Sequence, residues 1–149
     1  MDLSVVIPLY NESESIEELN KWITNTLNSK SISFEIIYID DGSSDGSWDI
    51  IKRLADSSNN IKGISFSKNF GKSQALNSGF IECKGKYVAT LDADLQDSPE
   101  EIPEMIDKLK KENLDLISGW KKRRFDSLIL KKIPSKLFNF VARYTSGIK

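Results

Sequence analysis

The sequence predicts an α/β domain in which a mostly parallel sheet carries helices on both faces. Continuous apolar runs rich in Val, Ile and Tyr recur along the chain, a pattern typical of parallel strands that are covered on both sides. Segments with apolar residues at helical spacing separate these runs. Because single helices between strands require right-handed crossovers, the strands are expected to run parallel.

The apolar runs place five strands, and the helical spacing places four helices between and after them. The predicted strands are residues 3–9, 34–39, 61–66, 87–91 and 114–118. The predicted helices include the apolar residues within 16–27, 48–55, 75–83 and 102–109. The last of these helices has a sharp start, because Ser98 and Glu101 form the pattern of a capping box with Pro99 at the first helical position.

Size and composition limit the function classes. At 149 residues and 39% hydrophobic content the chain is long enough to bury one core. It contains no histidine, which excludes Ser-His-Asp triads and histidine-based zinc sites within this chain. Its one cysteine, Cys83, fits a reducing compartment. A cytoplasmic location is therefore expected, and neither a signal peptide nor a membrane-spanning segment is predicted.

Charge divides the chain near residue 120. Residues 1–120 carry 12 Lys and Arg against 21 Asp and Glu, whereas residues 121–149 carry 9 basic residues against 1 acidic residue. The basic end is expected to face something anionic. Nucleic acid is not favoured as that partner, because the basic segment lacks a base-reading motif.

Polar residues follow each of the first four predicted strands. In a parallel sheet, ligands gather at the carboxyl ends of the strands, so these four loops are expected to converge on one rim. The loops are residues 8–12, 40–46, 67–72 and 92–97.

Asp92 and Asp94 leave a buried strand side by side, which is costly because like charges repel and burial disfavours ionisation. A divalent cation removes this cost, and hard oxygen ligands suit Mg²⁺ or Mn²⁺ bridging carboxylates to a diphosphate. The alternative interpretation is an acidic turn that caps the next helix. Taken alone, the triplet leaves both interpretations open.

The other rim loops also allow two interpretations, ligand binding and local structure. Asp40 and Asp41 offer acceptors for a nucleobase edge or for ribose hydroxyls, while a turn with a helix cap explains residues 43–46 equally well. Lys68 and Lys72 flank Gly71, where they meet either phosphate or solvent.

Four motifs together resemble the inverting family 2 glycosyltransferases of GT-A (Rossmann-like) fold. They are residues 5–12, 39–46, 69–72 and 91–97. The chain is most similar to the branch that includes dolichyl-phosphate mannosyltransferase and the bacterial undecaprenyl-phosphate glycosyltransferases. The resemblance covers residues 3 to about 147.

The resemblance implies a role for individual residues. The nucleotide would be bound by Pro8, Tyr10, Asn11, Glu12, Ile39, Asp40, Asp41, Lys72, Asp92 and Ala93. Asp92 and Asp94 would be the catalytic residues, and the metal, Mg²⁺ or Mn²⁺, would lie among Asp92, Asp94 and Gln96. No general base is identified.

The implied reaction transfers a sugar from a UDP- or GDP-sugar to a polyprenyl phosphate during synthesis of cell-envelope glycans. The metal would stabilise negative charge on the leaving diphosphate. A phosphate monoester with a second pKa of about 6 is largely dianionic at neutral pH, so this acceptor has little need of a general base.

The basic segment is expected to serve the acceptor. Lys121, Arg123 and Arg124 would contact its phosphate, and residues 128–144 mix apolar and basic residues as basic amphipathic helices at an anionic membrane surface do. A solvated or partner-facing basic helix is the alternative. The predicted organisation is a nucleotide-sugar-binding GT-A core at 1–120 and an acceptor- or membrane-side segment at 121–149. The protein is expected to be peripheral to, or anchored at, the cytoplasmic face of the membrane. A homo-oligomer is a further expectation.

One departure from the family pattern concerns the carboxyl end. Similar enzymes continue past residue 147 with another acidic segment, so a truncated chain is expected, with nucleotide binding retained. A family 2 transferase with a polysaccharide or soluble acceptor, and a nucleotide-sugar-binding fragment without turnover, remain as alternatives.

Overall fold

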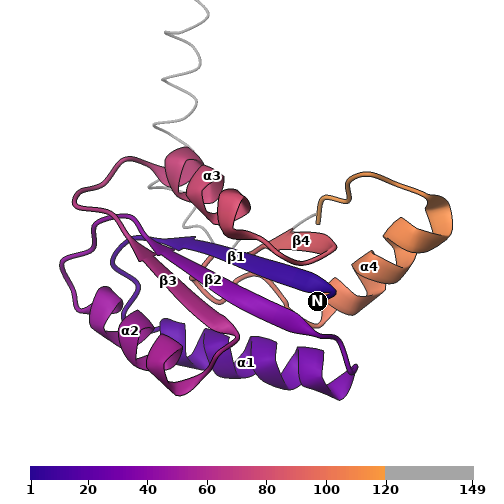
Figure 1. The fold of residues 1–149 in the computed structure, drawn as a ribbon, viewed down its shortest axis with the longest axis horizontal. Coiled ribbons are helices and arrows are strands. Elements are labelled where there is room, and N and C mark those ends of the chain that lie inside the picture. The colour runs from indigo at the N-terminus through magenta and orange to yellow at the C-terminus, as the bar shows by residue number, and fades with distance from the viewer. Residues whose placement is uncertain (120–149) are drawn as a thin grey trace, which may run out of the picture. The chain divides into compact units, whose positions relative to one another are not determined.

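The computed structural model describes residues 1–119, within which Met1–Ile117 form one compact unit. Strands and helices alternate along this unit (Figure 1). The elements are β1 (Leu3–Leu9), α1 (Ile16–Ser29), β2 (Phe34–Asp40), α2 (Ser47–Ser57), β3 (Ile61–Ser65), α3 (Lys72–Glu82), β4 (Tyr87–Thr90) and α4 (Glu101–Glu112). The first four predicted strands and all four predicted helices are confirmed, with strand ends that agree within one residue.

The sheet is parallel throughout, and its strand order is β3-β2-β1-β4. The chain steps outward from β1 through β2 to β3, and it then returns to place β4 on the other side of β1. Right-handed crossovers in opposite directions put the connecting helices on opposite faces. Accordingly, α1 and α2 lie on one face of the sheet and α3 lies on the other (Figure 1).

The larger core lies on the side of α1 and α2. Every residue of β1 and β2 is buried, because both strands are covered on both faces and paired on both edges. Helix α1 presents a buried stripe at helical spacing to this core, and α4 adds Ile102 and Ile106. The stripe consists of Ile16, Leu19, Ile23 and Leu27.

The smaller core lies between the sheet and α3, and it consists of Val6, Ile37, Ile39 and Ala75. Gly79 lets the helix approach the sheet closely. A Cβ at this position would lie 2.5 Å from Cγ1 of Val6 and 2.8 Å from Cδ1 of Ile39. Glycine is therefore required at residue 79 for the observed packing.

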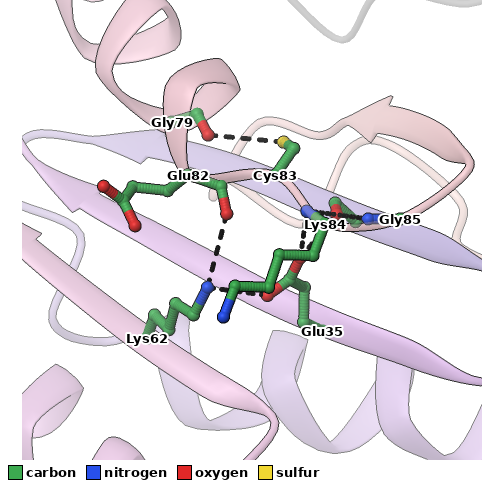
Figure 2. Close-up of polar contacts among 8 residues, drawn as sticks. Glu35, Lys62, Gly79, Glu82, Cys83, Lys84 and Gly85 are labelled. Carbon is green, nitrogen blue, oxygen red and sulfur yellow. Dashed lines mark hydrogen bonds and ion pairs between the residues drawn. The ribbon is translucent and has the colours of Figure 1, made fainter. Parts of the chain in front are cut away.

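A buried polar network fixes the end of α3 at the amino-terminal edge of the sheet (Figure 2). The Glu35 side chain is 2% exposed, and its Oε1 accepts hydrogen bonds from the Ser4 hydroxyl and the Lys84 N–H, each 2.7 Å long. Its Oε2 lies 2.9 Å from the Lys62 ammonium. The Gly85 N–H donates to the Ser4 hydroxyl at 2.8 Å. The connection from α3 to β4 is thus bonded to β1 and β2, and the Lys62 ammonium on β3 donates to the carbonyl of Glu82 at the end of α3 at 3.3 Å.

These contacts determine the ionisation of Glu35. Burial raises its pKa, but hydrogen bonds from the Ser4 hydroxyl, the Lys62 ammonium and the Lys84 N–H outweigh burial and lower the pKa below the usual range. The buried carboxylate is therefore charged and fully paired at neutral pH.

Two sequence predictions are wrong. The predicted fifth strand at 114–118 is not formed, because these residues find no partner strand among the described residues 1–119, and Leu116 is 82% exposed. The capping box is also absent. The Ser98 hydroxyl donates to the Glu100 carboxylate instead, and α4 begins at Glu101 without a side-chain cap.

No helix within residues 1–119 combines the length and the apolar character that crossing a membrane requires.

We expect Glu35→Gln to lower the free energy of unfolding at pH 7 by about 1–3 kcal/mol, because a buried carboxylate–ammonium pair is lost. Since the folded pKa of Glu35 is lowered, its contribution is present above the unfolded value of about 4.3 and disappears as pH falls through the folded value. Urea unfolding at pH 7 and at pH 3 should therefore show a smaller acid-induced loss in the variant than in the wild type.

Glu17→Gln is the matched control, because Glu17 pairs with Arg53 at the surface, where both side chains are more than half exposed. We expect this substitution to change stability by less than about 1 kcal/mol. Equal effects of the two substitutions would contradict a stabilising role for the buried network.

Candidate functional site

A cavity of about 320 Å³ opens at the carboxyl ends of the strands. It lies where the strand order reverses, between the loops that follow β1 and β4, which is where open α/β sheets bind their ligands. All four loops at this rim contribute to it, so the predicted convergence is confirmed. The lining residues are Pro8, Leu9, Tyr10, Glu12, Asp41, Asn69, Gly71, Lys72, Ala75, Asp92, Ala93 and Asp94.

The loops after β1 and β2 are bonded to each other. The Asn11 N–H donates to the Ser43 hydroxyl at 2.8 Å, and the Ser44 N–H donates to Oδ1 of Asn11 at 2.9 Å. The Glu12 N–H donates to the Ser47 hydroxyl at 3.1 Å. Asn11 has φ = 57°, a left-handed conformation that asparagine tolerates better than most residues. Asn11 therefore shapes the loop and does not line the cavity.

Asp45 reinforces the same junction. Its Oδ2 accepts from the Ser13 N–H at 3.0 Å, and its Oδ1 accepts from the N–H and the hydroxyl of Ser47 at 3.0 and 2.6 Å. Burial raises the pKa of Asp45, but these hydrogen bonds outweigh burial and hold the pKa well below its usual range. A turn stabilised by a side chain therefore accounts for residues 43–46.

Asp41 positions the loop that follows β3. Its side chain is buried, and its two oxygens accept from the Phe70 N–H at 2.7 Å and the Gly71 N–H at 2.9 Å. Gly42 has φ = 76°, and a Cβ there would lie 2.5 Å from the carbonyl carbon of Lys68. Glycine at residue 42 thus permits the close approach that brings this loop onto the end of β2.

Ile39 and Asp40 lie below the cavity. Ile39 belongs to the core under α3, and Asp40 is 1% exposed. The Asp40 carboxylate accepts from the Ser43 N–H at 2.9 Å and from the Ser65 hydroxyl at 3.4 Å. Both residues support the end of β2, and neither lines the cavity.

The loop after β4 presents its acidic side chains from a tight turn. The Asp92 N–H donates to Oδ2 of Asp97 at 2.9 Å, and the Gln96 N–H donates to Oδ1 of Asp94 at 3.1 Å. Leu95 has φ = 60° at the turn. Asp92 and Asp94 line the cavity, whereas the Gln96 side chain is exposed outside it.

The cavity is acidic, and its lining residues in the described part of the chain include one cationic side chain, Lys72. Burial raises the pKa of Glu12, and the negative charges of Asp94, Asp45 and Asp92 raise it further, while a hydrogen bond from Ser15 opposes them. The Lys72 ammonium forms an ion pair with Asp92. Carboxylates from the loops after β1 and β4 therefore share one electrostatic environment.

This donor set fits a hard divalent cation such as Mg²⁺ or Mn²⁺, which takes oxygen ligands from a few carboxylates. Within residues 1–119, no three Asp, Glu or Cys side chains form a complete metal site. Asp92 and Asp94 are the accessible carboxylates of the β4 loop, so further ligands would come from a bound phosphate or from water.

Most of the predicted site residues lie together. Those lining the cavity are Pro8, Tyr10, Glu12, Asp41, Lys72, Asp92, Ala93 and Asp94. Lys121, Arg123 and Arg124, predicted to contact the acceptor, lie outside the described residues. The sequence reasoning did not select Leu9, Asn69, Gly71 or Ala75 as site residues. Leu9, Asn69 and Gly71 lie within the motifs that carry the family resemblance, and Ala75 lies one helical turn after Lys72.

Comparison with known sequences identifies the family. Residues 4–147 match the sequence profile of glycosyl transferase family 2, which is nearly the whole chain. The chain belongs to glycosyl transferase family 2.

Two curated relatives of the chain are named for dodecaprenyl phosphate and undecaprenyl phosphate. The chain is 34% identical over 150 residues to dodecaprenyl-phosphate galacturonate synthase of Rhizobium johnstonii, covering 100% of this chain and 44% of that protein. It is 40% identical over 146 residues to undecaprenyl-phosphate 4-deoxy-4-formamido-L-arabinose transferase of Salmonella choleraesuis, covering 97% of this chain and 44% of that protein. The family 2 chain thus spans less than half the length of these relatives.

Solved structures confirm the GT-A fold. Glucosyl-3-phosphoglycerate synthase of Mycobacterium tuberculosis, in complex with Mn²⁺, UDP and phosphoglyceric acid, aligns with a TM-score of 0.57 at 26% identity, over 72% of this chain and 38% of that one. TarS of S. aureus in complex with UDP-GlcNAc also aligns with a TM-score of 0.57 at 24% identity, over 88% of this chain and 38% of that one. Mn²⁺ is therefore bound by a synthase that shares the fold.

We expect Asp41→Asn to loosen the loop after β3, because an amide NH₂ would face a backbone N–H that now has an acceptor. The loss of about 1–3 kcal/mol corresponds to roughly 5- to 150-fold faster hydrogen exchange at the amides of Phe70 and Gly71, measured by NMR. Asp49→Asn on the exposed surface of α2 is the control, and it should leave both amides unchanged. Unchanged protection in Asp41→Asn would show that the carboxylate does not hold the loop.

Proposed function

We propose that this chain is the sugar-nucleotide-binding, catalytic part of a transferase that moves a sugar from a UDP- or GDP-sugar to a polyprenyl phosphate. Family membership and the two relatives named for dodecaprenyl and undecaprenyl phosphate support the reaction class and the acceptor. The observation that carries the proposal is that Asp41, Lys72, Asp92 and Asp94 line one cavity.

The nucleoside end of the donor is assigned to the loops after β1 and β2. Each carboxylate oxygen of Asp41 already accepts one hydrogen bond from a backbone N–H, and each retains a lone pair for a base or ribose donor. Pro8 lines the adjacent wall, and Tyr10, 48% exposed at the rim, offers a ring face. Ala93, beside the acidic pair, leaves room for the ribose.

The diphosphate is assigned to the space between Lys72 and the loop after β4. Asp92 and Asp94, with Gln96 nearby, would hold Mg²⁺ or Mn²⁺, which supplies positive charge where the leaving diphosphate develops negative charge. Lys72 adds a second positive charge from the start of α3. In the transfer, the bond from the anomeric carbon to the diphosphate oxygen breaks as an acceptor phosphate oxygen attacks that carbon. Because that oxygen is already anionic, the chain need only position it.

The acceptor side of the proposal depends on the basic segment. Lys121, Arg123 and Arg124 would bind the lipid phosphate, and the apolar and basic residues of 128–144 would lie at an anionic membrane surface on the cytoplasmic side. These roles remain proposals, as does the separation of a core at 1–120 from an acceptor segment at 121–149.

A soluble acceptor is the second candidate. The likeness to glucosyl-3-phosphoglycerate synthase, solved with phosphoglyceric acid, favours it, because that protein shares the fold at 26% identity.

We expect Asp94→Ala to abolish the metal-dependent part of nucleotide affinity, lowering affinity at least about tenfold, because a charged oxygen ligand is lost. Asp94 is exposed and accepts one described hydrogen bond, so folding should survive. Calorimetric titration with UDP and GDP, with and without Mn²⁺, measures the effect. Asp107→Ala on the exposed side of α4 is the control. Loss of folding would favour the acidic-turn interpretation, and unchanged affinity would remove Asp94 from the metal site.

Transfer itself is tested with a panel of nucleotide sugars, Mn²⁺ and undecaprenyl phosphate in vesicles. We expect sugar-labelled lipid from the wild type, and at least about tenfold less from Lys121→Ala/Arg123→Ala/Arg124→Ala at unchanged nucleotide affinity. Transfer to phosphoglyceric acid in place of lipid would support the second candidate. Nucleotide binding without transfer to either acceptor would contradict the enzymatic proposal for this chain.

A further inference from the structure

Lys72 and Asp92 form an ion pair across the cavity that the proposed function does not by itself require. Lys72 is the first residue of α3, and Asp92 follows the end of β4. The Lys72 side chain is 59% exposed and that of Asp92 is 39% exposed, so both groups are accessible from the cavity.

The backbone of Lys72 is held in place. The preceding residue, Gly71, donates its N–H to Asp41, and its carbonyl accepts from the N–H groups of Gln74 and Ala75 at 3.0 and 3.2 Å. Ala75 is fully buried against the sheet. Any exchange of partners by the ammonium must therefore occur through rotation of the long Lys72 side chain, which has the rotamer freedom to do so.

The charge balance of the cavity links this ion pair to the binding of a divalent cation. Glu12, Asp92 and Asp94 line the cavity together, and among the lining residues within 1–119 Lys72 is the one cationic side chain. While Lys72 neutralises Asp92, a divalent cation entering alone must displace the ammonium, which is then left to water because the Lys72 side chain is 59% exposed. A diphosphate entering with the cation supplies a new partner, because an ammonium binds phosphate oxygens well.

We propose that Lys72 occupies Asp92 in place of the metal until the donor arrives, so that the divalent cation and the diphosphate are captured together. This inference rests on the proposed function, and it adds an ordering device to the same site. By linkage, the diphosphate strengthens metal binding by the factor by which the metal strengthens diphosphate binding, and Lys72 contributes to that factor.

The test measures Mn²⁺ affinity in the absence of nucleotide, by the electron paramagnetic resonance signal of free Mn²⁺. We expect Lys72→Met to bind Mn²⁺ about two- to fivefold more tightly than the wild type, the range that an exposed ion pair allows. We expect the same variant to bind UDP or GDP in saturating Mn²⁺ more weakly than the wild type. A residue that only contacts phosphate would change the second affinity alone.

Two matched variants distinguish the effect of the ion pair on Mn²⁺ affinity from the general effect of positive charge near the cavity. Lys72→Arg keeps the charge and should match the wild type within about twofold. Lys68→Met removes a charge from the same loop, where the ammonium lies 5.2 Å above the centre of the Phe70 ring, and it should leave Mn²⁺ affinity unchanged. Lys72→Gln replaces Lys72→Met if thermal unfolding shows that the latter does not fold.

Mn²⁺ affinity that is unchanged or weaker in Lys72→Met overturns the proposal, and so does an equal gain in Lys68→Met. In either case, nucleotide binding by the wild type leaves the proposed function standing. If the wild type binds neither UDP nor GDP, the proposed function fails, and this inference fails with it.

Discussion

The reversal of strand order at β1 is the constraint on which the site depends. Successive right-handed crossovers lead outward to β3, and the return to β4 then forces α3 onto the opposite face. The loops after β1 and β4 consequently lie beside each other at the carboxyl edge of the sheet, where the strand order reverses. The cavity lies at this point, and the loops after β2 and β3 complete its wall.

Acidic residues at the rim divide into two groups by what they contact. The carboxylates of the first group accept backbone N–H groups and hold the loops together, and the members are Asp40, Asp41, Asp45 and Asp97. Glu12, Asp92 and Asp94 form the second group, whose side chains all line the cavity. Asp41 and Asp94 belong to both descriptions, because each accepts at least one backbone N–H group and also lines the cavity. Shape and charge in this site therefore come from the same residue type.

The sequence predicted the sheet well, because strands buried on both faces leave continuous apolar runs whose ends are visible. It failed where the outcome depends on distant partners. The apolar pattern at 114–118 resembles a strand, but a strand requires an edge to pair with. The Ser98 hydroxyl hydrogen-bonds to the Glu100 carboxylate and not to a backbone N–H at the start of the helix. The predicted rim residues converged because topology places strand ends together. Asn11 and Asp40 were selected by the same logic, but their contacts turn them toward neighbouring loops.

Helix α3 is fastened at both ends and pressed against the sheet between them. At one end the Gly71 N–H is bound by Asp41, and at the other the Lys84 N–H is bound by Glu35, with Gly79 in close contact midway. The number of residues between these anchors is consequently fixed. Adding or removing one residue would turn the start of the helix by about 100° relative to its end. Lys72 would then leave the cavity while the fold around it remained, so length variation in this protein should be confined to other connections.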